Sequence, residues 1–293
     1  MAEALGRELL RAGARLSLWS RTARRATALR RRLVTSVGGS ARRVRTAARL
    51  GQALAGEEAW VLCVSDDAIA EVAERAAAAV DAGVAPARVA LHTNGFHGTP
   101  PLLALERAGL ATGVLHPLVP LPPSAPVLVD ERPLRGAWFA VTGAPRARTL
   151  ARRVVRALGG SILELGDAPE AARSYHAGAS LLAGGVVALF DAALAAVVRG
   201  ARDPRAARRA LLALLEGSVA NLAVLSPEDA LTGPAARGAK ETLRAQLEVL
   251  ARSGRGPGEP AALYRALLPR MLALAEARGA VTSAERRALE RLL

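Results

Sequence analysis

The chain has 293 residues, a formal net charge of +14, and 51% hydrophobic and 23% charged residues, which is typical of a folded protein rather than a disordered one. This length favours two domains, since single hydrophobic cores usually stop growing at roughly 250–300 residues. The single cysteine, Cys63, excludes an internal disulfide, and one cysteine with four histidines excludes a zinc-finger framework.

Positive charge is concentrated near the beginning of the chain. Between Glu8 and Glu57 there are twelve arginines and no acidic residue, whereas Lys240 is the only lysine in the sequence. This segment would attract phosphate-bearing partners, although arginines on a solvated helix face would give the same pattern. Because aromatic residues make up only 3% of the chain and no helix-turn-helix pattern is present, we do not expect nucleic acid to be the partner.

One segment is apolar enough to resemble a membrane span. Residues 177–198 contain a single charged residue, Asp191, but are rich in alanine and glycine rather than in leucine and isoleucine. An ionised aspartate within a span would be costly, so we expect a buried central helix of an all-helical domain instead. The first ten residues include Glu3, Arg7 and Glu8 and lack the apolar core of a secretory signal, which predicts a cytoplasmic protein.

Strand-like and helix-like segments alternate through the first half of the chain. Residues 2–12 place leucines on one helical face and stop at Gly13, and residues 59–64 form a continuous apolar run, as in a strand buried on both faces. We expect strands at 14–19, 59–64, 88–92, 112–115, 137–142 and 161–165, and helices at 2–12, 68–80, 102–108 and 146–158. This alternation predicts a parallel sheet with helices on both faces.

The pattern changes near Gly166, after which no convincing strand follows. Long helical patterns are expected at 168–198, 204–225, 235–252, 260–278 and 283–293. The sequence therefore predicts an α/β protein with a parallel sheet over residues 1–166 and an all-α domain over residues 167–293.

The second strand of a dinucleotide-binding sheet ends where the protein reads the adenosine ribose. Here the strand at 14–19 is followed by Ser20, Arg21 and Thr22, with Arg25 close behind. An acidic residue at this place would select NAD, whereas a guanidinium matches the 2′-phosphate of NADP. The turn therefore favours NADPH, and a plain basic turn is the alternative.

Short motifs spread over most of the chain resemble one family. They are residues 2–22, VLCVSDDAI at 61–69, His92-Thr93-Asn94-Gly95, His116-Pro117-Leu118, Tyr175-His176-Ala177, Asn221-Leu222, and Ala230-Leu231-Thr232-Gly233-Pro234 with Arg237-Gly238. Together they resemble the Rossmann-like family whose C-terminal half is the domain of unknown function 2520, among relatives of 6-phosphogluconate dehydrogenase, ketopantoate reductase and pyrroline-5-carboxylate reductase. The resemblance implies a Rossmann-like NADP-binding domain at 1–166, a helical dimerisation and substrate domain at 167–293, and a homodimer that buries residues 177–198.

The resemblance also concerns the beginning of the chain. Family members carry Gly-x-Gly-x-x-Gly before the first helix, and Ala2 stands at the position of the third glycine. We expect either a strand and glycine turn of about ten residues ahead of Met1 or a protein that has lost its phosphate turn. The spaced glycines Gly254, Gly256 and Gly258 follow a helix instead of a strand and do not supply that turn.

Ligands of such sheets lie outside the carboxyl ends of the strands. His116 follows a short strand, with Pro117 fixing the backbone beside it, while Tyr175 and His176 open the first long helix of the second domain. Asn221 and Arg237 are expected to close the cleft from that domain. The predicted cofactor contacts are Ser20, Arg21, Thr22 and Arg25 on the adenosine side, and Val64, Ser65, Asp66, Thr93, Asn94 and Gly95 on the nicotinamide side.

Hydride transfer to a carbonyl or imine needs orientation and one proton donor. The titratable candidates are His116, His176, Tyr175 and Lys240. We expect one of the two histidines to be the donor, with Arg237 anchoring an anionic substrate. Each candidate also has a structural interpretation, since His176 can cap its helix and Tyr175 can be a core residue.

Several family positions carry other residues in this chain. Ala183 and Gly184 replace a Ser-Asn pair, Ala239 replaces an aspartate, and Asn94 and Val119 replace a serine and a glutamine. Loss of several polar groups is typical of an enzyme that has lost its activity. The sequence therefore leaves two functions open. One is an NADPH-dependent oxidoreductase acting on a small anionic keto or imine substrate, and the other is a catalytically inactive relative that binds a nucleotide or a protein.

Overall fold

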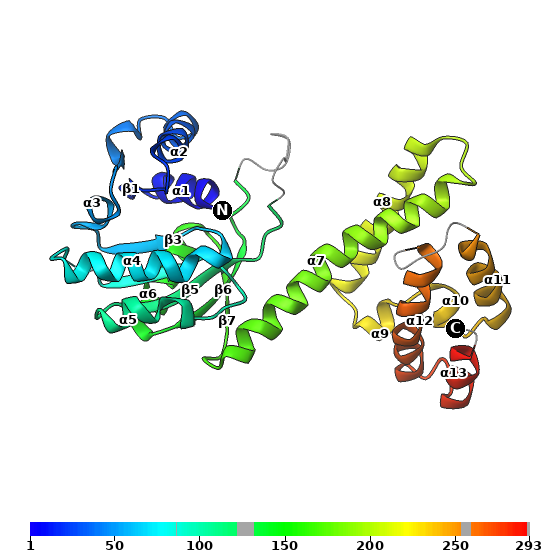
Figure 1. Cartoon of the computed structure of the whole chain (residues 1–293). Helices are drawn as coiled ribbons and strands as arrows, with labels where there is room; N and C mark the ends of the chain where they lie inside the picture. The colour runs from blue at the N-terminus through cyan, green and yellow to red at the C-terminus, as the bar shows by residue number, and fades with distance from the viewer. Residues whose placement is uncertain (86, 122–131, 253–258, 292–293) are drawn as a thin grey trace. The chain divides into compact units, whose positions relative to one another are not determined.

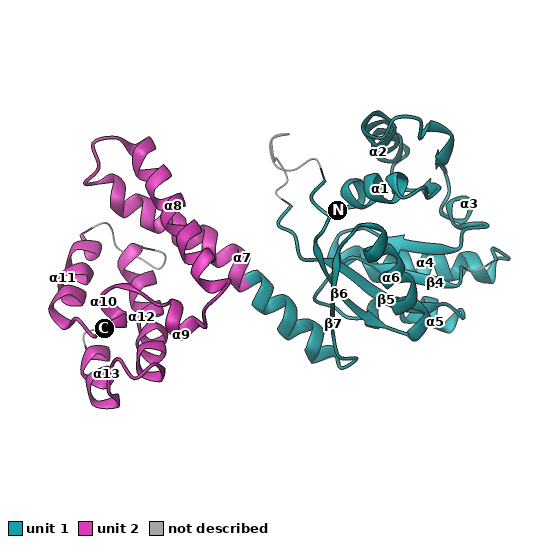
Figure 2. Cartoon of the chain, turned by 180° about the vertical axis from the view of Figure 1, so that it is seen from behind, with its two compact units in different colours: residues 1–180 teal, residues 181–293 magenta. Residues whose placement is uncertain are grey.

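A computed structural model of the chain describes residues 1–85, 87–121, 132–252 and 259–291 (Figure 1). The chain divides into two compact units, which are Met1–Ser180 and Leu181–Leu293 (Figure 2). The division falls inside one 30-residue helix, α7 (Pro169–Val198), and the predicted boundary at Gly166 lies just before that helix begins. Each unit has a hydrophobic core of its own. The glycines at 254, 256 and 258 lie outside the described residues.

The strands of the first unit form two separate sheets. In the smaller sheet, β1 (Leu16–Leu18) pairs in parallel with β2 (Val44–Thr46). The larger sheet has the order β3-β4-β5-β6-β7, with bounds Ala59–Leu62, Val89–His92, Ala111–Pro117, Trp138–Gly143 and Ser161–Glu164. Its first three strands are parallel to one another, so their carboxyl ends meet at one edge of the sheet.

The pairing of β5 with β6 differs from the sequence-based expectation. A parallel sheet was predicted throughout, but this pair is antiparallel, with His116 opposite Ala140. The antiparallel neighbour also explains why β5 runs past its predicted end at Leu115, since β6 supplies backbone partners there. The Leu118 N–H continues this pairing and donates to the Trp138 carbonyl at 2.8 Å.

Helices cover both faces of the larger sheet, as the alternating pattern predicted. On one face, α3 (Leu50–Leu54), α4 (Ile69–Asp81) and α5 (Leu103–Arg107) pack against Trp60 and Ala90. On the other face, α1 (Ala2–Arg11) and α6 (Pro145–Ala157) pack against a core that includes the fully buried Phe139. Short 3₁₀ turns precede β2, α4 and α5, at Ala41–Arg43, Asp66–Ala68 and Pro100–Leu102.

Three elements inside the arginine-rich segment were not predicted. They are α2 (Ala23–Ser36), β2 and α3. Ala26 and Leu33 of α2 are buried at one helical spacing, and Leu33 packs with Leu10 and Val44. Five of the fourteen residues of α2 are arginines, which hides this apolar spacing and explains why the sequence did not indicate the helix.

A buried carboxylate anchors α1 to the rest of the unit. Glu8 is 3% exposed and pairs with Arg11 of the same helix and with Arg132. Arg132 donates to both carboxylate oxygens, at 3.0 and 2.5 Å, in the bidentate geometry that suits a guanidinium. The hydrogen bonds from Arg132 are the largest influence on the Glu8 carboxyl and hold its pKa below the ordinary value, against the opposing effect of burial.

The described part of the second unit is helical. Its elements after α7 are α8 (Pro204–Leu222), α9 (Pro227–Ala230), α10 (Gly233–Ala236), α11 (Lys240–Ala251), α12 (Pro260–Ala277) and α13 (Ser283–Glu290). Leu243, Leu268 and Leu272 are buried at the centre of a core that α10, α11, α12 and α13 build. The all-α character predicted for this half is therefore confirmed.

The expectation that residues 177–198 form a buried helix is wrong for the single chain. Only 6% of the most apolar window of α7 is buried, and Leu181, Leu182 and Val187 are 78%, 70% and 69% exposed. By length and composition, α7 is the one helix of the described chain that could cross a membrane. The helix is exposed because the core built by α10, α11, α12 and α13 includes no residue of α7.

Candidate active site in the first unit

The parallel strands of the larger sheet bring three predicted loops to one edge. Residues 63–66 follow β3, residues 93–95 follow β4, and His116 lies at the end of β5. Val64, Ser65 and Asp66 are exposed, whereas Asn94 and Gly95 are buried. This edge therefore carries most of the residues predicted for the nicotinamide side.

His92, at the end of β4, organises the loop that follows it. Its Nδ1 accepts a hydrogen bond from the Asn94 N–H at 3.1 Å, so its Nε2 carries the proton and donates to the Gly98 carbonyl at 2.6 Å. The Asn94 side-chain oxygen accepts from the N–H groups of Phe96 and His97, at 2.8 and 2.9 Å. The loop is thus fixed from both ends. Sequence analysis selected Asn94 as a site residue but did not select His92. The feature that could have identified His92 is its position as a polar residue at the end of a fully buried strand.

His116 and Tyr175 form the central contact of the site. His116 Nδ1 and the Tyr175 hydroxyl share a hydrogen bond of 2.7 Å, and their rings meet edge to face at 5.7 Å between centroids. Fifty-nine positions separate the two residues in the chain. Tyr175 lies in the second turn of α7, within the part of that helix that belongs to the first unit.

Gly95 makes room for the His116 ring. A Cβ atom at Gly95 would lie 2.8 Å from His116 Cγ and Nδ1, a distance that real side chains do not adopt. Because the ring rests on the backbone of the loop after β4, it is held between that loop and Tyr175. Gly95 was predicted as a cofactor contact, and its position against His116 gives it a second, structural role.

His176 and Phe96 complete the aromatic surroundings. The His176 ring lies 5.7 Å from that of His116 and 5.8 Å from that of Phe96, between centroids. Ser180, one turn further along α7, places its hydroxyl 3.4 Å from His176 Nδ1. His176, predicted as a site residue, therefore belongs to this cluster, and the half-exposed Phe96 is a member that the sequence did not indicate.

Burial keeps the central pair uncharged. Burial, reinforced by the neighbouring His176 and His92, lowers the pKa of His116 from 6.5 to about 4, and Asp66 acts weakly in the opposite direction. Burial also raises the pKa of Tyr175 well above its ordinary value of 10. At neutral pH the site therefore holds a neutral imidazole bonded to an intact phenol, which is an arrangement able to give one proton to a bound ligand.

The four residues predicted to bind the adenosine side lie in a turn of their own. Ser20 and Arg21 follow β1, Thr22 precedes α2, and Arg25 lies in the first turn of that helix. Arg21, Thr22 and Arg25 are exposed. Within the described chain, no acidic side chain forms an ion pair with either arginine. The first turn of α2 contains no acidic residue, so this helix end carries uncompensated positive charge.

The remaining predicted residues belong to the second unit. Asn221 lies near the end of α8, Arg237 follows α10, and Lys240 begins α11. All three side chains are exposed. The histidine–tyrosine cluster is built from first-unit residues alone, so the roles predicted for these three residues stay predictions.

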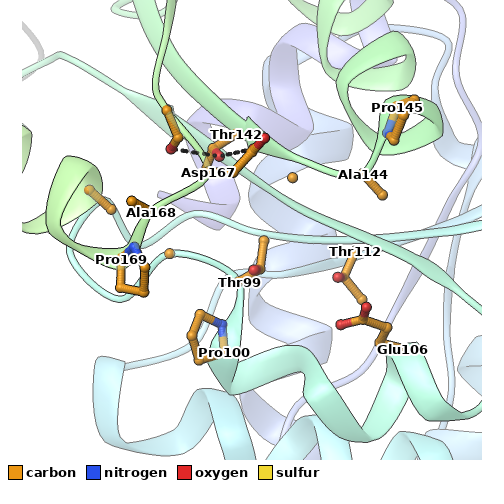
Figure 3. Close-up of a pocket in the computed structure, with 14 residues that line it drawn as sticks. Thr99, Pro100, Glu106, Thr112, Thr142, Ala144, Pro145, Asp167, Ala168 and Pro169 are labelled. Carbon is orange, nitrogen blue, oxygen red and sulfur yellow. Dashed lines mark hydrogen bonds between the residues drawn. The ribbon is translucent and has the colours of Figure 1, made fainter.

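A separate pocket of about 310 Å³ lies elsewhere in the first unit and contains none of the predicted site residues (Figure 3). Thr112 and Thr142 line it together with Glu106 and Asp167. The Thr142 hydroxyl donates to the Gly166 carbonyl at 3.3 Å and approaches the Asp167 carboxylate at 3.4 Å (Figure 3). Thr112 precedes His116 by four residues on β5, and the pocket is also lined by Gly98 and Ala172, from the loop and the helix that carry the cluster.

Part of the chain matches a known family. Residues 137–270 match the family described as a domain of unknown function, DUF2520. This finding confirms the resemblance that the short motifs indicated. A comparison with curated proteins found no match.

Solved structures with a similar fold cover nearly all of the chain. A protein from Thermotoga maritima aligns with a TM-score of 0.64 at 18% identity, over 92% of this chain and 95% of that one. An imine reductase from Streptomyces aurantiacus aligns with a TM-score of 0.60 at 20% identity, over 98% and 95% of the two chains. A pyrroline-5-carboxylate reductase from Coxiella burnetii gives 0.57 at 14% identity, over 98% and 94%. These similarities confirm the predicted fold class, a Rossmann-like α/β domain followed by helices.

The buried position of His116 predicts a pH-dependent stability. Because its pKa falls from 6.5 to about 4 on folding, the unfolded chain takes up a proton that the folded chain does not. This contribution is complete above pH 6.5 and is lost as the pH falls toward 4. We expect wild type to lose about 2 kcal/mol more unfolding free energy than His116→Gln between about pH 7 and pH 4.5. Urea unfolding at both pH values measures the difference, and equal losses in the two proteins would contradict it.

Proposed function

We propose that this chain, whose residues 137–270 match the DUF2520 family, is an NADPH-dependent oxidoreductase that reduces a keto or imine group of a small substrate in the cytoplasm. The observation that carries the proposal is the hydrogen-bonded pair His116–Tyr175 beside the carboxyl ends of β3, β4 and β5. Ligands of doubly wound sheets lie at this edge. The pair is uncharged and contains a dissociable proton, which reduction of a polar double bond requires.

Tyr175 is the proton donor in this proposal, and His116 positions it. With its proton on Nδ1, His116 donates to the Tyr175 oxygen, and the phenolic hydrogen is free to point toward the substrate. When bound, NADPH supplies the hydride to the substrate carbon. Tyr175 gives its proton to the substrate nitrogen or oxygen, and the resulting phenolate is stabilised by the His116 N–H until solvent returns a proton. For His116 this assignment departs from the expectation that a histidine is the donor, because an imidazole with a pKa of about 4 carries no extra proton at pH 7. His176 stays the second candidate for the donor.

The basic turn after β1 supports the choice of NADPH over NADH. Arg24 and Arg25 lie in the first turn of α2, where the positive end of the helix makes a cation unfavourable, and Arg21 lies two residues before the helix. A bound phosphate would relieve this repulsion, because it would meet both the helix end and the guanidinium groups. The turn therefore fits the 2′-phosphate end of the cofactor.

We also propose that the chain works as a homodimer. Large apolar side chains are exposed along α7, α8 and the loop after α8, namely Leu181, Leu182, Val187, Leu214, Val219, Leu222, Val224 and Leu225, at 45–81%. Apolar surface on this scale marks an interaction site. The exposed Asp191 within the same stretch of α7 disfavours a lipid partner. A second copy of the same helices is the partner that this apolar surface fits best.

Removing the Tyr175 hydroxyl tests the chemistry. We expect Tyr175→Phe to lower kcat by about 10²–10⁴-fold with little change in NADPH binding, since a positioned proton donor contributes this much. NADPH oxidation against a panel of keto acids and cyclic imines measures it. Tyr264→Phe is the matched control, because Tyr264 is the other tyrosine of the chain and its hydroxyl donates to Gln246 in the second unit. If wild type turns over and Tyr175→Phe turns over equally fast, another group donates the proton. If wild type does not turn over, the alternative function, a catalytically inactive relative, is favoured.

Charge reversal at Arg21 tests the cofactor preference. A guanidinium–phosphate hydrogen bond contributes about 1.5–3 kcal/mol, so Arg21→Glu should weaken NADPH binding by roughly 10–100-fold and leave NADH binding nearly unchanged. Titration of both nucleotides by fluorescence or calorimetry measures the two affinities. Arg42→Glu, an equal charge change at another exposed arginine of the same basic segment, is the control. Equal losses for both nucleotides would mean that Arg21 does not read the 2′-phosphate.

Light scattering tests the dimer. We expect a dimer for wild type at micromolar concentration and a monomer for Leu182→Asp, because a charge in the centre of an apolar interface is left desolvated. Val249→Asp changes a residue of similar exposure on α11, outside the proposed interface, and should leave the dimer intact. A monomeric wild type would disprove the proposal.

A further inference from the structure

The pocket that Figure 3 shows contains a buried polar side chain without a partner. Thr112 lines the pocket and is 3% exposed, and its hydroxyl makes no hydrogen bond with another described residue. The Glu106 carboxylate of α5 points toward it across the pocket (Figure 3). A buried hydroxyl without a partner is costly, and a ligand in the pocket that hydrogen-bonds to it would remove that cost.

Glu106 makes the part of the pocket beside Thr112 negative. Its carboxylate forms no ion pair with a described residue, and none of the described residues that line the pocket is a lysine, arginine or histidine. The second carboxylate of the lining, Asp167, differs because Arg148 neutralises it and because its side chain is 75% exposed. Glu106 and the Thr112 hydroxyl therefore offer hydrogen-bond acceptors to a cationic donor such as an ammonium group.

The beginning of α6 makes another part of the pocket positive. Ala144 and Pro145 line the pocket where this 13-residue helix starts, and its first turn has neither an acidic residue nor a side-chain cap. The first N–H groups of a helix lack intrahelical partners and carry a positive partial charge. A carboxylate is a suitable partner for such groups. Figure 3 shows Pro145 and Glu106 on different sides of Thr112, so the two parts of the pocket are separate.

Strand pairing keeps the two parts close enough for one small molecule to reach both. Thr142 stands opposite Val114 in the β5–β6 pair, so Thr142 and Thr112 share one face of the sheet, about 7–8 Å apart. The Ala144 N–H donates to the Thr112 carbonyl at 2.9 Å, which holds the start of α6 beside Thr112. The pocket volume of about 310 Å³ lies at the lower end of the range for ligand sites, which favours a small ligand.

We propose that this pocket binds a free amino acid, whose ammonium group contacts Glu106 and Thr112 and whose carboxylate contacts the N–H groups at the start of α6. A simple amine would leave the helix end without a partner, and a simple carboxylate would leave Glu106 without one. A zwitterion satisfies both, and because it is neutral overall, the chain's net charge of +14 does not repel it. The inference rests on this pocket alone and is independent of the proposed reaction.

Titration of the full chain with each of the common amino acids in turn tests the proposal, by calorimetry or ligand-observed NMR. For the amino acid that binds best, the N-acetyl derivative lacks the ammonium group and the methyl ester lacks the carboxylate. Each derivative should bind at least about tenfold more weakly, because a hydrogen bond to a charged group is lost. A derivative that binds as tightly as the parent would overturn the proposal, as would the absence of binding by every amino acid.

Two substitutions in the lining locate the site. Glu106→Gln should weaken binding of the amino acid by roughly tenfold and change binding of its N-acetyl derivative little, since that derivative has no ammonium group. Thr112→Val should also weaken binding without lowering the melting temperature, because the hydroxyl it removes has no partner in the protein alone. Glu74→Gln is the matched control, at an exposed glutamate of α4 outside the described lining. Unchanged binding in both lining variants would overturn the proposal.

Tyr175→Phe separates this pocket from the proposed active site. The variant should bind the amino acid as wild type does, because Tyr175 is not among the described residues that line the pocket. Loss of binding in Tyr175→Phe, with normal binding in Glu106→Gln and Thr112→Val, would place the amino acid beside His116 and overturn the proposal. A protein that does not oxidise NADPH but binds the amino acid in this pattern would contradict the proposed function and leave the pocket assignment supported.

Discussion

Parallel pairing of β3, β4 and β5 is the constraint on which the first unit depends. It brings the loops after β3 and β4 to one edge and ends β5 beside them at His116. The His92 ring then fixes the loop that bears Gly95, and Gly95 leaves space for the His116 imidazole. The strand pairing and the His92 contacts depend on backbone hydrogen bonds, and the last step depends on the missing side chain at Gly95.

Much of the fold could be predicted from the sequence because its signals are local. Continuous apolar runs such as 59–62 and 89–92 predict buried strands, and the leucine spacing of 2–11 predicts a helix, as the structure confirms. The arginine-rich α2 was missed because only two of its positions are buried. The exposure of α7 was not predicted, because an apolar sequence indicates that the helix surface is covered by something. It does not indicate whether the covering residues come from the same chain or from another one.

The candidate site, like the fold, could be predicted from the sequence only in part. Individual residues such as His116, Tyr175 and His176 could be selected from their chemistry and from the resemblance to a family. Their mutual contact could not, because it depends on how far α7 extends beside the sheet and on which turn of that helix faces β5. Protonation states were also beyond sequence reasoning, since burial, which lowers the pKa of His116 and raises that of Tyr175, exists only in the fold.

The buried Glu8 carboxylate has a consequence for the response of the first unit to acid. Its pairing with Arg132 and Arg11 holds its pKa below the ordinary value, so the unfolded chain takes up a proton before the folded chain does. This contribution to stability is present at neutral pH and is lost as the pH falls through the pKa of the folded state. Because protonation weakens both ion pairs, acid loosens the attachment of α1 to the rest of the unit.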